Sequence, residues 1–332
     1  MSYIKLGIIG SNFVADWLCE SVERSRDYAG IVNHAVYSRT AERGNEFAAR
    51  HGIKHVYTDM EEFLSSDIDA VYIASPNFLH APQAIVAMRH GKHVLVEKPA
   101  ALSVSEFDEM CACAAENGVV LLEAMRPAHD AALSTIREAI PKLGTLRRVL
   151  LEFCQYSSRY DSFRAGEVMN AFDPTLGNAA VMDIGVYALE VAVLLFGEPR
   201  DVTSRSVKLH NGFEGMGSVF LDYGTFTVET VYSKITSSVT PSVITGEDGS
   251  LLLGKLSTLD SLTLCPRGAE PRVLFSGRET DGECNMVYEL ADFSRMLHGT
   301  MSAKPFEEAT RGTLRIIDEI RRQNGIAFSN NG

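Results

Sequence analysis

Two short motifs in the sequence carry side chains that can move a proton. Lys98 lies in a Glu-Lys-Pro motif that ends an apolar, strand-like run, and Asp183 and Tyr187 lie four residues apart in a helix-like segment. Side chains at this spacing project from one face of a helix, about one turn from each other. A tyrosine is a poor base at neutral pH, but a neighbouring cation favours its ionised form. Taken singly, each motif also fits a structural role, as a loop after a strand or a packed core residue.

A turn suited to a phosphate follows the first apolar run. Within residues 7–15, Gly10 and Ala15 match the outer positions of the dinucleotide-binding fingerprint, and Asn12 stands at the middle one, where a glycine lets the backbone approach the pyrophosphate. Asparagine is among the few residues that tolerate a left-handed backbone, so we expect the turn to form. A strand–turn–helix without a ligand is the alternative interpretation. The expected cofactor contacts are Gly10, Ser11, Asn12, Phe13 and Val14.

The end of the second strand-like run bears on the choice of cofactor. NAD-binding domains usually carry an acidic residue there, which binds the ribose hydroxyls. This chain has Ser38 and Arg39, followed by Arg43. A guanidinium pairs with a phosphate through its planar fork, and a serine hydroxyl donates a hydrogen bond. The pattern predicts a site for the 2′-phosphate of NADP, with NAD as the second candidate; alternatively, both arginines are solvated residues at a helix start.

Alternating strand and helix patterns in residues 1–125 must position these motifs. The strand-like runs lie near residues 4–9, 31–37, 55–57, 70–74, 93–96 and 119–122. Helical patterns follow most of them, which predicts a doubly wound parallel sheet with helices on both faces, a Rossmann-type α/β domain. Ligands of such domains bind at the carboxyl ends of the strands, where the motifs fall.

Residues 126–332 predict a second domain of the α+β class. Helical patterns near residues 131–140 and 179–196 are followed by alternating strands such as that at 225–232, so its sheet is expected to be open and mostly antiparallel. A final helix is expected at about 307–322. We expect this domain to bind the substrate and to mediate oligomerisation.

One face of such a sheet needs cover from outside the domain. Helices on one side leave the other exposed, and Phe226, Val228 and Tyr232 are the apolar residues that we expect to pair across subunits. The sequence therefore predicts a homo-oligomer, either a dimer or a tetramer.

Composition limits the classes of partner. The 332 residues include 31 Lys and Arg against 43 Asp and Glu, a formal net charge of −12, which argues against a nucleic-acid-binding surface. No uncharged apolar run approaches the ~20 residues that span a bilayer, and the N-terminus lacks the regions of a signal peptide, so we expect a cytoplasmic protein that does not bind membranes. The six cysteines include no Cys-x-x-Cys pair, and no metal site is predicted.

Three motifs together resemble a known family. Residues 74–80 (Ala-Ser-Pro-Asn-Phe-Leu-His) and 97–99 (Glu-Lys-Pro) end two strands, and residues 183–187 (Asp-Ile-Gly-Val-Tyr) lie in the second domain. In order and spacing the chain resembles the Gfo/Idh/MocA oxidoreductases over nearly its whole length. Many members have histidine where Tyr187 stands, and the tyrosine version is similar to the branch of dihydrodiol, xylose and glucose–fructose oxidoreductases, which typically use NADP. Asn12 and a reduced glycine lead-in at residues 176–178 depart from the family pattern.

The resemblance implies an oxidoreductase that transfers a hydride between NADP and a sugar, polyol or related cyclic alcohol or carbonyl. Tyr187 would exchange the proton, Lys98 would favour its ionised form and orient the substrate oxygen, and Asp183 would bind the substrate or Lys98. The site would then form where the two domains meet. Further cofactor contacts are expected from Ser75, Asn77, His80, Glu97 and Lys98. Substrate contacts are expected from Arg126, His129 and Tyr156.

Other classes of function stay open at this point. A glycosidase-type hydrolase would use NAD for a transient oxidation, but such relatives resemble the histidine branch, so Tyr187 argues against it. A non-catalytic NADP-binding sensor would not need Lys98, Asp183 and Tyr187. An S-adenosylmethionine-dependent methyltransferase shares the glycine turn, but it leaves the later motifs unexplained and is set aside.

Overall fold

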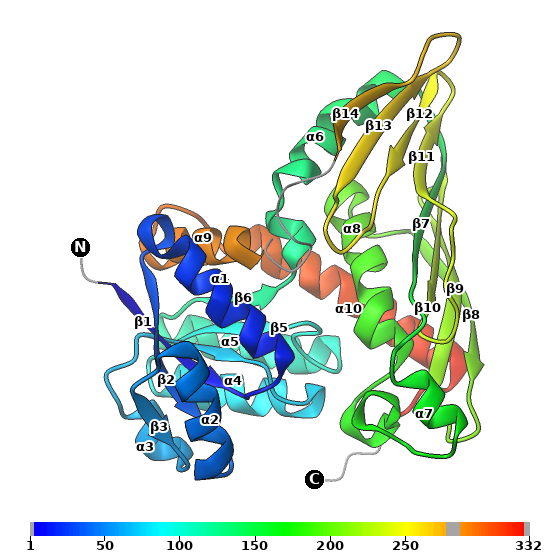
Figure 1. Ribbon diagram of the computed structural model, residues 1–332. Helices are drawn as coiled ribbons and strands as arrows, with labels where there is room; N and C mark the ends of the chain where they lie inside the picture. Colours follow the sequence, from blue (N-terminus) through cyan, green and yellow to red (C-terminus); the bar gives the residue numbers. More distant parts are fainter. Residues whose placement is uncertain (1–2, 277–285, 329–332) are drawn as a thin grey trace. The chain divides into compact units, whose positions relative to one another are not determined.

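The computed structural model describes residues 3–276 and 286–328, which divide into two compact units (Figure 1). The first unit comprises Met1–Arg126 and Glu283–Glu308, and the second comprises Pro127–Gly282 and Ala309–Gly332. This division differs from the single boundary after residue 125 that we predicted, because a later segment returns to the first unit.

The first unit is built on a parallel sheet of six strands in the order β3-β2-β1-β4-β5-β6, as the sequence predicts. The strands are β1 (Ile4–Ile9), β2 (Ile31–Tyr37), β3 (His55–Tyr57), β4 (Ala70–Ile73), β5 (His93–Glu97) and β6 (Leu121–Ala124). Ile9 pairs with Tyr37 on one side and Ile73 on the other, so the residues that follow these three strands meet at one edge.

The helices of the first unit begin and end at local signals in the sequence. They are α1 (Phe13–Ala29), α2 (Ala41–His51), α3 (Met60–Leu64), α4 (His80–Arg89), α5 (Val104–Asn117) and α9 (Met286–Leu297). Asp59 and Ser103 accept hydrogen bonds from the backbone N–H groups of Glu62 and Glu106, the capping arrangement typical of an Asp or Ser three residues before a Glu. Gly118 ends α5 with a φ of +64°, the left-handed conformation that glycine adopts without strain.

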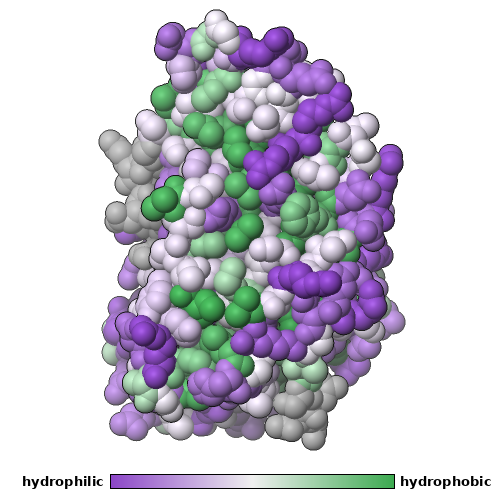
Figure 2. All heavy atoms as spheres, turned by 90° about the vertical axis from the view of Figure 1, so that its right-hand side faces the viewer, coloured by the Kyte–Doolittle hydropathy of each residue, from purple (hydrophilic) through white to green (hydrophobic). Residues whose placement is uncertain are grey.

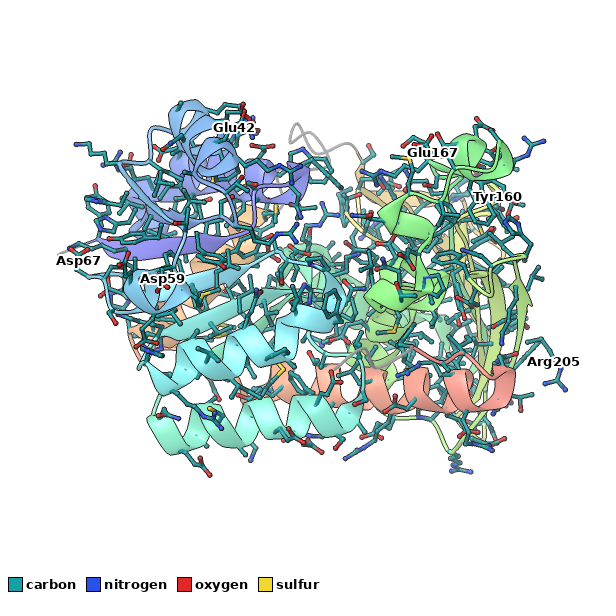
Figure 3. All side chains as sticks on the ribbon, turned by 90° about the horizontal axis from the view of Figure 1, so that it is seen from below. Glu42, Asp59, Asp67, Tyr160, Glu167 and Arg205 are labelled. Carbon is teal, nitrogen blue, oxygen red and sulfur yellow. The ribbon has the colours of Figure 1, made fainter. Side chains whose placement is uncertain are left out.

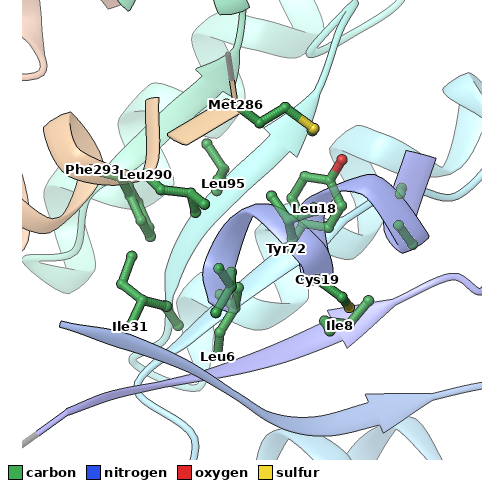
Figure 4. Packing of buried hydrophobic residues seen from close by; sticks show 14 of the residues in the cluster. Leu6, Ile8, Leu18, Cys19, Ile31, Tyr72, Leu95, Met286, Leu290 and Phe293 are labelled. Carbon is green, nitrogen blue, oxygen red and sulfur yellow. The ribbon is translucent and has the colours of Figure 1, made fainter. Parts of the chain in front are cut away.

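The α9 helix was not predicted from the sequence, and it completes the core of the first unit by packing on α1. Figure 4 shows Leu290 and Phe293 of α9 gathered with Leu18 of α1 and Leu6 and Ile31 of the sheet. All five side chains are fully buried. Without α9, this apolar face of α1 would be open to water.

The second unit contains an eight-stranded, mostly antiparallel sheet in the order β14-β13-β12-β11-β7-β10-β9-β8. The strands are β7 (Leu146–Cys154), β8 (Asp201–Lys208), β9 (Glu214–Asp222), β10 (Thr227–Ser233), β11 (Ser242–Gly246), β12 (Gly249–Leu253), β13 (Ser261–Pro266) and β14 (Arg272–Ser276). Only the β7–β10 pair is parallel among the described strands of this sheet. The helices are α6 (Ala131–Ala139), α7 (Tyr160–Arg164), α8 (Val186–Phe196) and α10 (Lys304–Asn324).

The strand residues that we expected to pair across subunits face the domain's own helices instead. Val228 and Tyr232 are fully buried, and Phe226 packs on Phe196 of α8 with ring centroids 5.2 Å apart. The expectation is wrong for these three side chains, because the alternation in a strand reveals two faces without indicating which one is covered.

The opposite face of this sheet carries a different apolar set. Strand pairing places one residue of each strand in a row across the face: Thr203, Phe220, Glu229, Leu150, Val243, Leu252, Thr263 and Val273. Phe220, Leu252 and Val273 are exposed. Figure 2 shows green apolar patches between purple hydrophilic residues on the side where β8 and β9 lie in Figure 1.

None of the helices in residues 3–276 and 286–328 is long and apolar enough to cross a membrane. The same ranges hold no group of three or more His, Cys, Asp and Glu side chains arranged to bind a metal ion.

Candidate active site

The turn after β1 runs close to the end of β4. Gly10 has a φ of +110°, and a Cβ atom on it would lie 2.8 Å from the carbonyl oxygen of Ala74. Asn12 has φ −93° and ψ 176°, so the turn forms without the left-handed asparagine that we expected. Its Oδ1 atom accepts hydrogen bonds of 3.1 Å from the N–H groups of Val14 and Ala15, and its Nδ2 atom donates one of 2.8 Å to Ala74. Asn12 therefore caps α1 and ties it to β4.

The amino end of α1 is suited to an anion, because the helix dipole places partial positive charge there. Ser11 and Phe13 flank it, partly buried and exposed respectively. Asp16 lies in the first turn, with its Oδ1 atom 2.8 Å from Nη2 of Arg50 and 2.7 Å from Nε2 of His51. Partial burial raises the pKa of Asp16, but the hydrogen bonds from His51 and Arg50 lower it overall. Its negative charge is thus compensated and opposes a phosphate only weakly.

The predicted 2′-phosphate residues lie together at the end of β2. Ser38 is buried, and its N–H donates to the carbonyl oxygen of Tyr57 at 3.0 Å. Arg39 and Arg43 are exposed on either side of the start of α2, with Glu42 labelled in Figure 3. Among the described residues, neither guanidinium forms an ion pair with a carboxylate. Both arginines are therefore available to an external anion.

His80 joins the loops that follow β4 and β5. Its Nδ1 atom lies 2.8 Å from the carbonyl oxygen of Pro99 and its Nε2 atom 2.9 Å from that of Ser75, and the residue is 1% exposed. Burial lowers the pKa of His80, against the hydrogen bonds to the two carbonyl groups, which raise it. The ring thus holds the loops rather than presenting an open face. Ser75 donates its hydroxyl to Gln83 at 2.7 Å, and Asn77 begins a short 3₁₀ turn, partly exposed.

A buried carboxyl cluster lies behind the end of β5. Tyr72 donates a hydrogen bond of 2.5 Å to Glu97. Burial raises the pKa of Glu97. Burial and, to a smaller extent, the charge of Glu97 raise the pKa of Glu289 well above its usual range. The positive charge of Arg126 opposes both shifts. Glu289 is 0% exposed, and within the described residues neither of its carboxyl oxygens has a hydrogen-bond partner. Burial therefore favours the protonated form of this α9 carboxyl group.

The backbone around Lys98 is fixed by the next strand. Lys98 is partly exposed, and the peptide bond to Pro99 is cis. Ala100 donates its N–H to Oε1 of the buried Glu123 on β6 at 2.7 Å. The Glu-Lys-Pro motif is therefore held at both ends, by the hydrogen bond from Tyr72 to Glu97 and by that from Ala100 to Glu123.

Sequence analysis missed Tyr72, Glu123 and Glu289 as parts of this region. The two glutamates had a usable signal, since each is a charged residue within an otherwise apolar run. A buried acid needs either a partner or a proton, so such interruptions point to a polar network beneath a site.

In the second unit, Asp183 and Tyr187 are carried by an irregular helix start. A π-helical turn spans Val181–Gly185 and leads directly into α8, where we predicted one continuous helix. Widened turns of this kind are frequent at functional sites. The buried Glu214 of β9 fixes the turn, accepting hydrogen bonds of 2.8 Å from the N–H of Val181 and 3.1 Å from the hydroxyl of Ser206.

Close packing holds the same turn against the sheet. Gly185 lies on the ring of Tyr232, where a Cβ atom would come within 2.9 Å, and Gly217 lies against the hydroxyl end of that ring. Tyr187 is mostly buried and packs edge-on against Phe153 of β7, with ring centroids 5.5 Å apart. The position of the phenol thus follows from the core of the second unit.

Asp183 has a partner that the sequence did not suggest. Its Oδ2 atom lies 2.6 Å from Nζ of Lys234, which follows β10 directly. We expected this carboxylate to bind the substrate or Lys98, and the structure pairs it with a lysine of its own unit.

The three expected substrate contacts fall in different places. Arg126 ends the first segment of the first unit, near Glu97, and His129 lies in the second unit, partly buried. Tyr156 is exposed after β7 and donates its hydroxyl to Asp161 at 2.6 Å. Their contact with a substrate stays a prediction.

Comparison with known proteins bears on this arrangement. A family model described as an oxidoreductase family with an NAD-binding Rossmann fold matches residues 4–125, and a GFO/IDH/MocA C-terminal domain model matches residues 134–252. The chain belongs to the Gfo/Idh/MocA oxidoreductase family. The predicted family and fold class are therefore confirmed, and the chain is an oxidoreductase of this family.

Two relatives within the Gfo/Idh/MocA family are similar over most of the chain. Scyllo-inositol 2-dehydrogenase (NADP(+)) IolU of Bacillus subtilis is 41% identical, with 98% of each chain covered. Trans-1,2-dihydrobenzene-1,2-diol dehydrogenase of Mus musculus is 26% identical, with 89% of each covered. Among solved structures, the 3-ketoreductase KijD10 of Actinomadura kijaniata, in complex with TDP-benzene and NADP, matches with a TM-score of 0.79 at 22% identity over 97% of this chain and 98% of that one. This last likeness concerns the fold alone.

Proposed function

We propose that this chain is an NADP-dependent dehydrogenase or reductase of a polyol, sugar or related cyclic alcohol or carbonyl. The observation that carries the choice of cofactor is the pair Arg39 and Arg43, exposed beside Ser38 at the end of β2 and without a carboxylate partner in the described ranges. The name of the Bacillus subtilis relative, which includes NADP and scyllo-inositol, supports both the cofactor and the substrate class.

The residues of the first unit fit a dinucleotide. Gly10 permits the close approach of the turn to the end of β4, the N-terminus of α1 supplies partial positive charge, and the two arginines supply positive charge for a further phosphate. When bound, the nicotinamide group accepts or supplies a hydride. We assign two groups of residues to the binding of the dinucleotide phosphates: Gly10, Ser11, Asn12, Phe13 and Val14 at the turn after β1, and Ser38, Arg39 and Arg43 after β2. Further contacts with the dinucleotide are assigned to Ser75, Asn77 and Glu97 at the ends of β4 and β5.

The chain's own residues then handle the proton of the alcohol. We assign Tyr187 Oη as the atom that takes the hydroxyl proton during oxidation and returns it during reduction. Lys98 binds the substrate oxygen and orients it towards the hydroxyl group of Tyr187. Asp183 accepts a hydrogen bond from the substrate. His80, buried between two carbonyl groups, acts by holding the loops rather than by touching the cofactor.

A screen of polyols and sugars with NADP and with NAD, followed by nicotinamide absorbance, tests the proposal. Turnover of a polyol with a preference for NADP is the expected result. A retained cofactor and cleaved glycosides without net change in absorbance would favour the hydrolase, and NADP binding without any turnover would favour the sensor.

We also propose that the exposed face of the second unit's sheet pairs with another copy of the chain. The register-matched row with Phe220, Leu252 and Val273 supports this, since exposed apolar residues in one row are unusual without a partner. Light scattering on Phe220→Arg tests it: a smaller particle than wild type is expected, with Tyr28→Arg as an exposed aromatic control in the first unit.

A further inference from the structure

Lys234 is a buried lysine that the proposed reaction has not yet used. Its side chain is 6% exposed, and its Nζ atom lies 2.6 Å from Oδ2 of Asp183 and donates to the carbonyl oxygen of Ala171 at 3.1 Å. The same ammonium group lies over the rings of Phe172 and Phe213, 5.1 Å and 5.5 Å from their centroids. Two acceptors and two aromatic faces therefore surround this charge.

The pair is asymmetric in its exposure. The side chain of Asp183 is 42% exposed, against 6% for Lys234. Removal of a charge from water is costly unless a partner compensates it, so the lysine depends on this carboxylate more than the carboxylate depends on the lysine for solvation. The consequence for Asp183 is one of position and charge: a fixed cation holds one of its oxygens in place and favours its ionised form.

The lysine itself is held by backbone on both sides. The N–H of Lys234 donates to Gly215 at 2.9 Å, and its carbonyl oxygen accepts from Ser157 at 2.9 Å. Around Phe172, Tyr160 stacks on its ring and Phe163 packs on it at a tilt, with ring centroids 5.5 Å and 5.3 Å away (Tyr160 is labelled in Figure 3). This aromatic cluster limits the water around the ammonium group, which strengthens its interaction with the carboxylate.

We propose that Lys234 is a positioning residue that fixes Asp183 as an ionised acceptor for a second hydroxyl group of the substrate. Asp183 and Tyr187 project from one helical segment, so a carboxylate held at one point selects polyols that place a hydroxyl there while another reacts. This inference rests on the proposed function for its catalytic consequence, whereas the coupling between the two residues can be measured without turnover.

A double-mutant cycle over Lys234→Met and Asp183→Asn tests the coupling by thermal unfolding. Asp183→Asn should lower the midpoint by roughly 5–10 °C, because it leaves a buried lysine uncompensated. Lys234→Met should cost less, since Asp183 reaches water, and the double variant should recover part of the loss. Additive losses in the cycle would overturn the inference whatever the protein catalyses.

The same variants are then assayed with the polyol that the wild type turns over. Lys234→Met should lower kcat/KM by roughly 100-fold through misplacement of Asp183, leave the Kd for NADP unchanged, and add nothing further in the Asp183→Asn background. Lys234→Arg should restore kcat/KM to within about tenfold of wild type. Full activity of a stably folded Lys234→Met, or a second 100-fold loss in the Asp183→Asn background, would overturn it. Absence of any turnover by the wild type would contradict the proposed function and leave the unfolding cycle as the deciding result.

Discussion

Asn12 and Ala74 are joined by a hydrogen bond of 2.8 Å from the side-chain amide to the carbonyl oxygen, which ties the start of α1 to the end of β4. The fingerprint of this fold places a glycine at the position of Asn12. Here the side chain of the asparagine joins the turn after β1 to the end of β4 by a hydrogen bond. The turn therefore forms without the left-handed backbone conformation that a glycine would allow.

Replacement of Asn12 separates these contributions. Asn12→Ala should lower the free energy of unfolding by about 1–2 kcal/mol, because the cap of α1 and the bond to Ala74 are both lost. Asn12→Gly should cost less, since glycine is tolerated at a helix N-cap. Urea unfolding followed by circular dichroism measures both. Equal losses for the two variants would contradict the capping role.

The arginines after β2 should determine the choice between cofactors. Arg39→Ala with Arg43→Ala should raise the Kd for NADP roughly 10–100-fold and leave that for NAD within about twofold, since charged hydrogen bonds to the 2′-phosphate are lost. Fluorescence titration with both dinucleotides measures the change. Arg89→Ala, an exposed arginine at the end of α4, is the matched control. Parallel weakening of NAD and NADP would refute the assignment.

Tyr187→Phe should reduce turnover by roughly 100-fold or more, because it removes the oxygen that exchanges the proton and keeps the ring. The edge-on contact with Phe153 is retained, so the thermal midpoint and the Kd for NADP should stay at wild-type values. Steady-state kinetics and a thermal melt give the comparison. Full activity of the variant would contradict the assignment of Tyr187 as the proton-exchanging residue.

Glu289→Gln should stabilise the protein at high pH. Burial raises the folded-state pKa of Glu289, so the folded state binds its proton more tightly than the unfolded state does, and stability falls as pH rises from about 4.5 through the raised value. The variant lacks this loss. Its thermal midpoint should equal that of wild type near pH 4.5 and exceed it increasingly towards pH 8.

An exposed glutamate serves as the control for this prediction. Glu116→Gln on α5 should leave the difference from wild type constant over the same pH range. A Glu289→Gln midpoint that runs parallel to wild type at every pH would show that the carboxyl group is already ionised and compensated.

Features that depend on local sequence were predictable. The six parallel strands follow from short apolar runs, and glycine or proline comes shortly after β1, β4 and β5. The caps at Asp59 and Ser103 involve residues only three positions apart. The motif at Lys98 and the pair of Asp183 and Tyr187 could be singled out by residue type and spacing alone.

Features that depend on contacts between distant segments were not. Lys234 is an ordinary lysine at a strand end until the fold brings it to Asp183. Met286, Leu290 and Phe293 have helical spacing, but nothing local shows that α1 is their partner. The alternation around Tyr232 likewise gave the period of β10 and left open which face the helices cover.

The return of α9 to the first unit sets an order of events on the ribosome. Residues 1–126 emerge first, yet the helix that covers α1 follows the whole sheet of the second unit in the sequence. A nascent chain must therefore carry a complete parallel sheet whose helix α1 still lacks its cover, with apolar side chains of α1 exposed, while about half of the protein is still to be translated. All eight strands of the second unit, by contrast, precede α9 in the sequence. During synthesis from the N-terminus, the second unit can therefore assemble its sheet before α9 completes the core of the first unit.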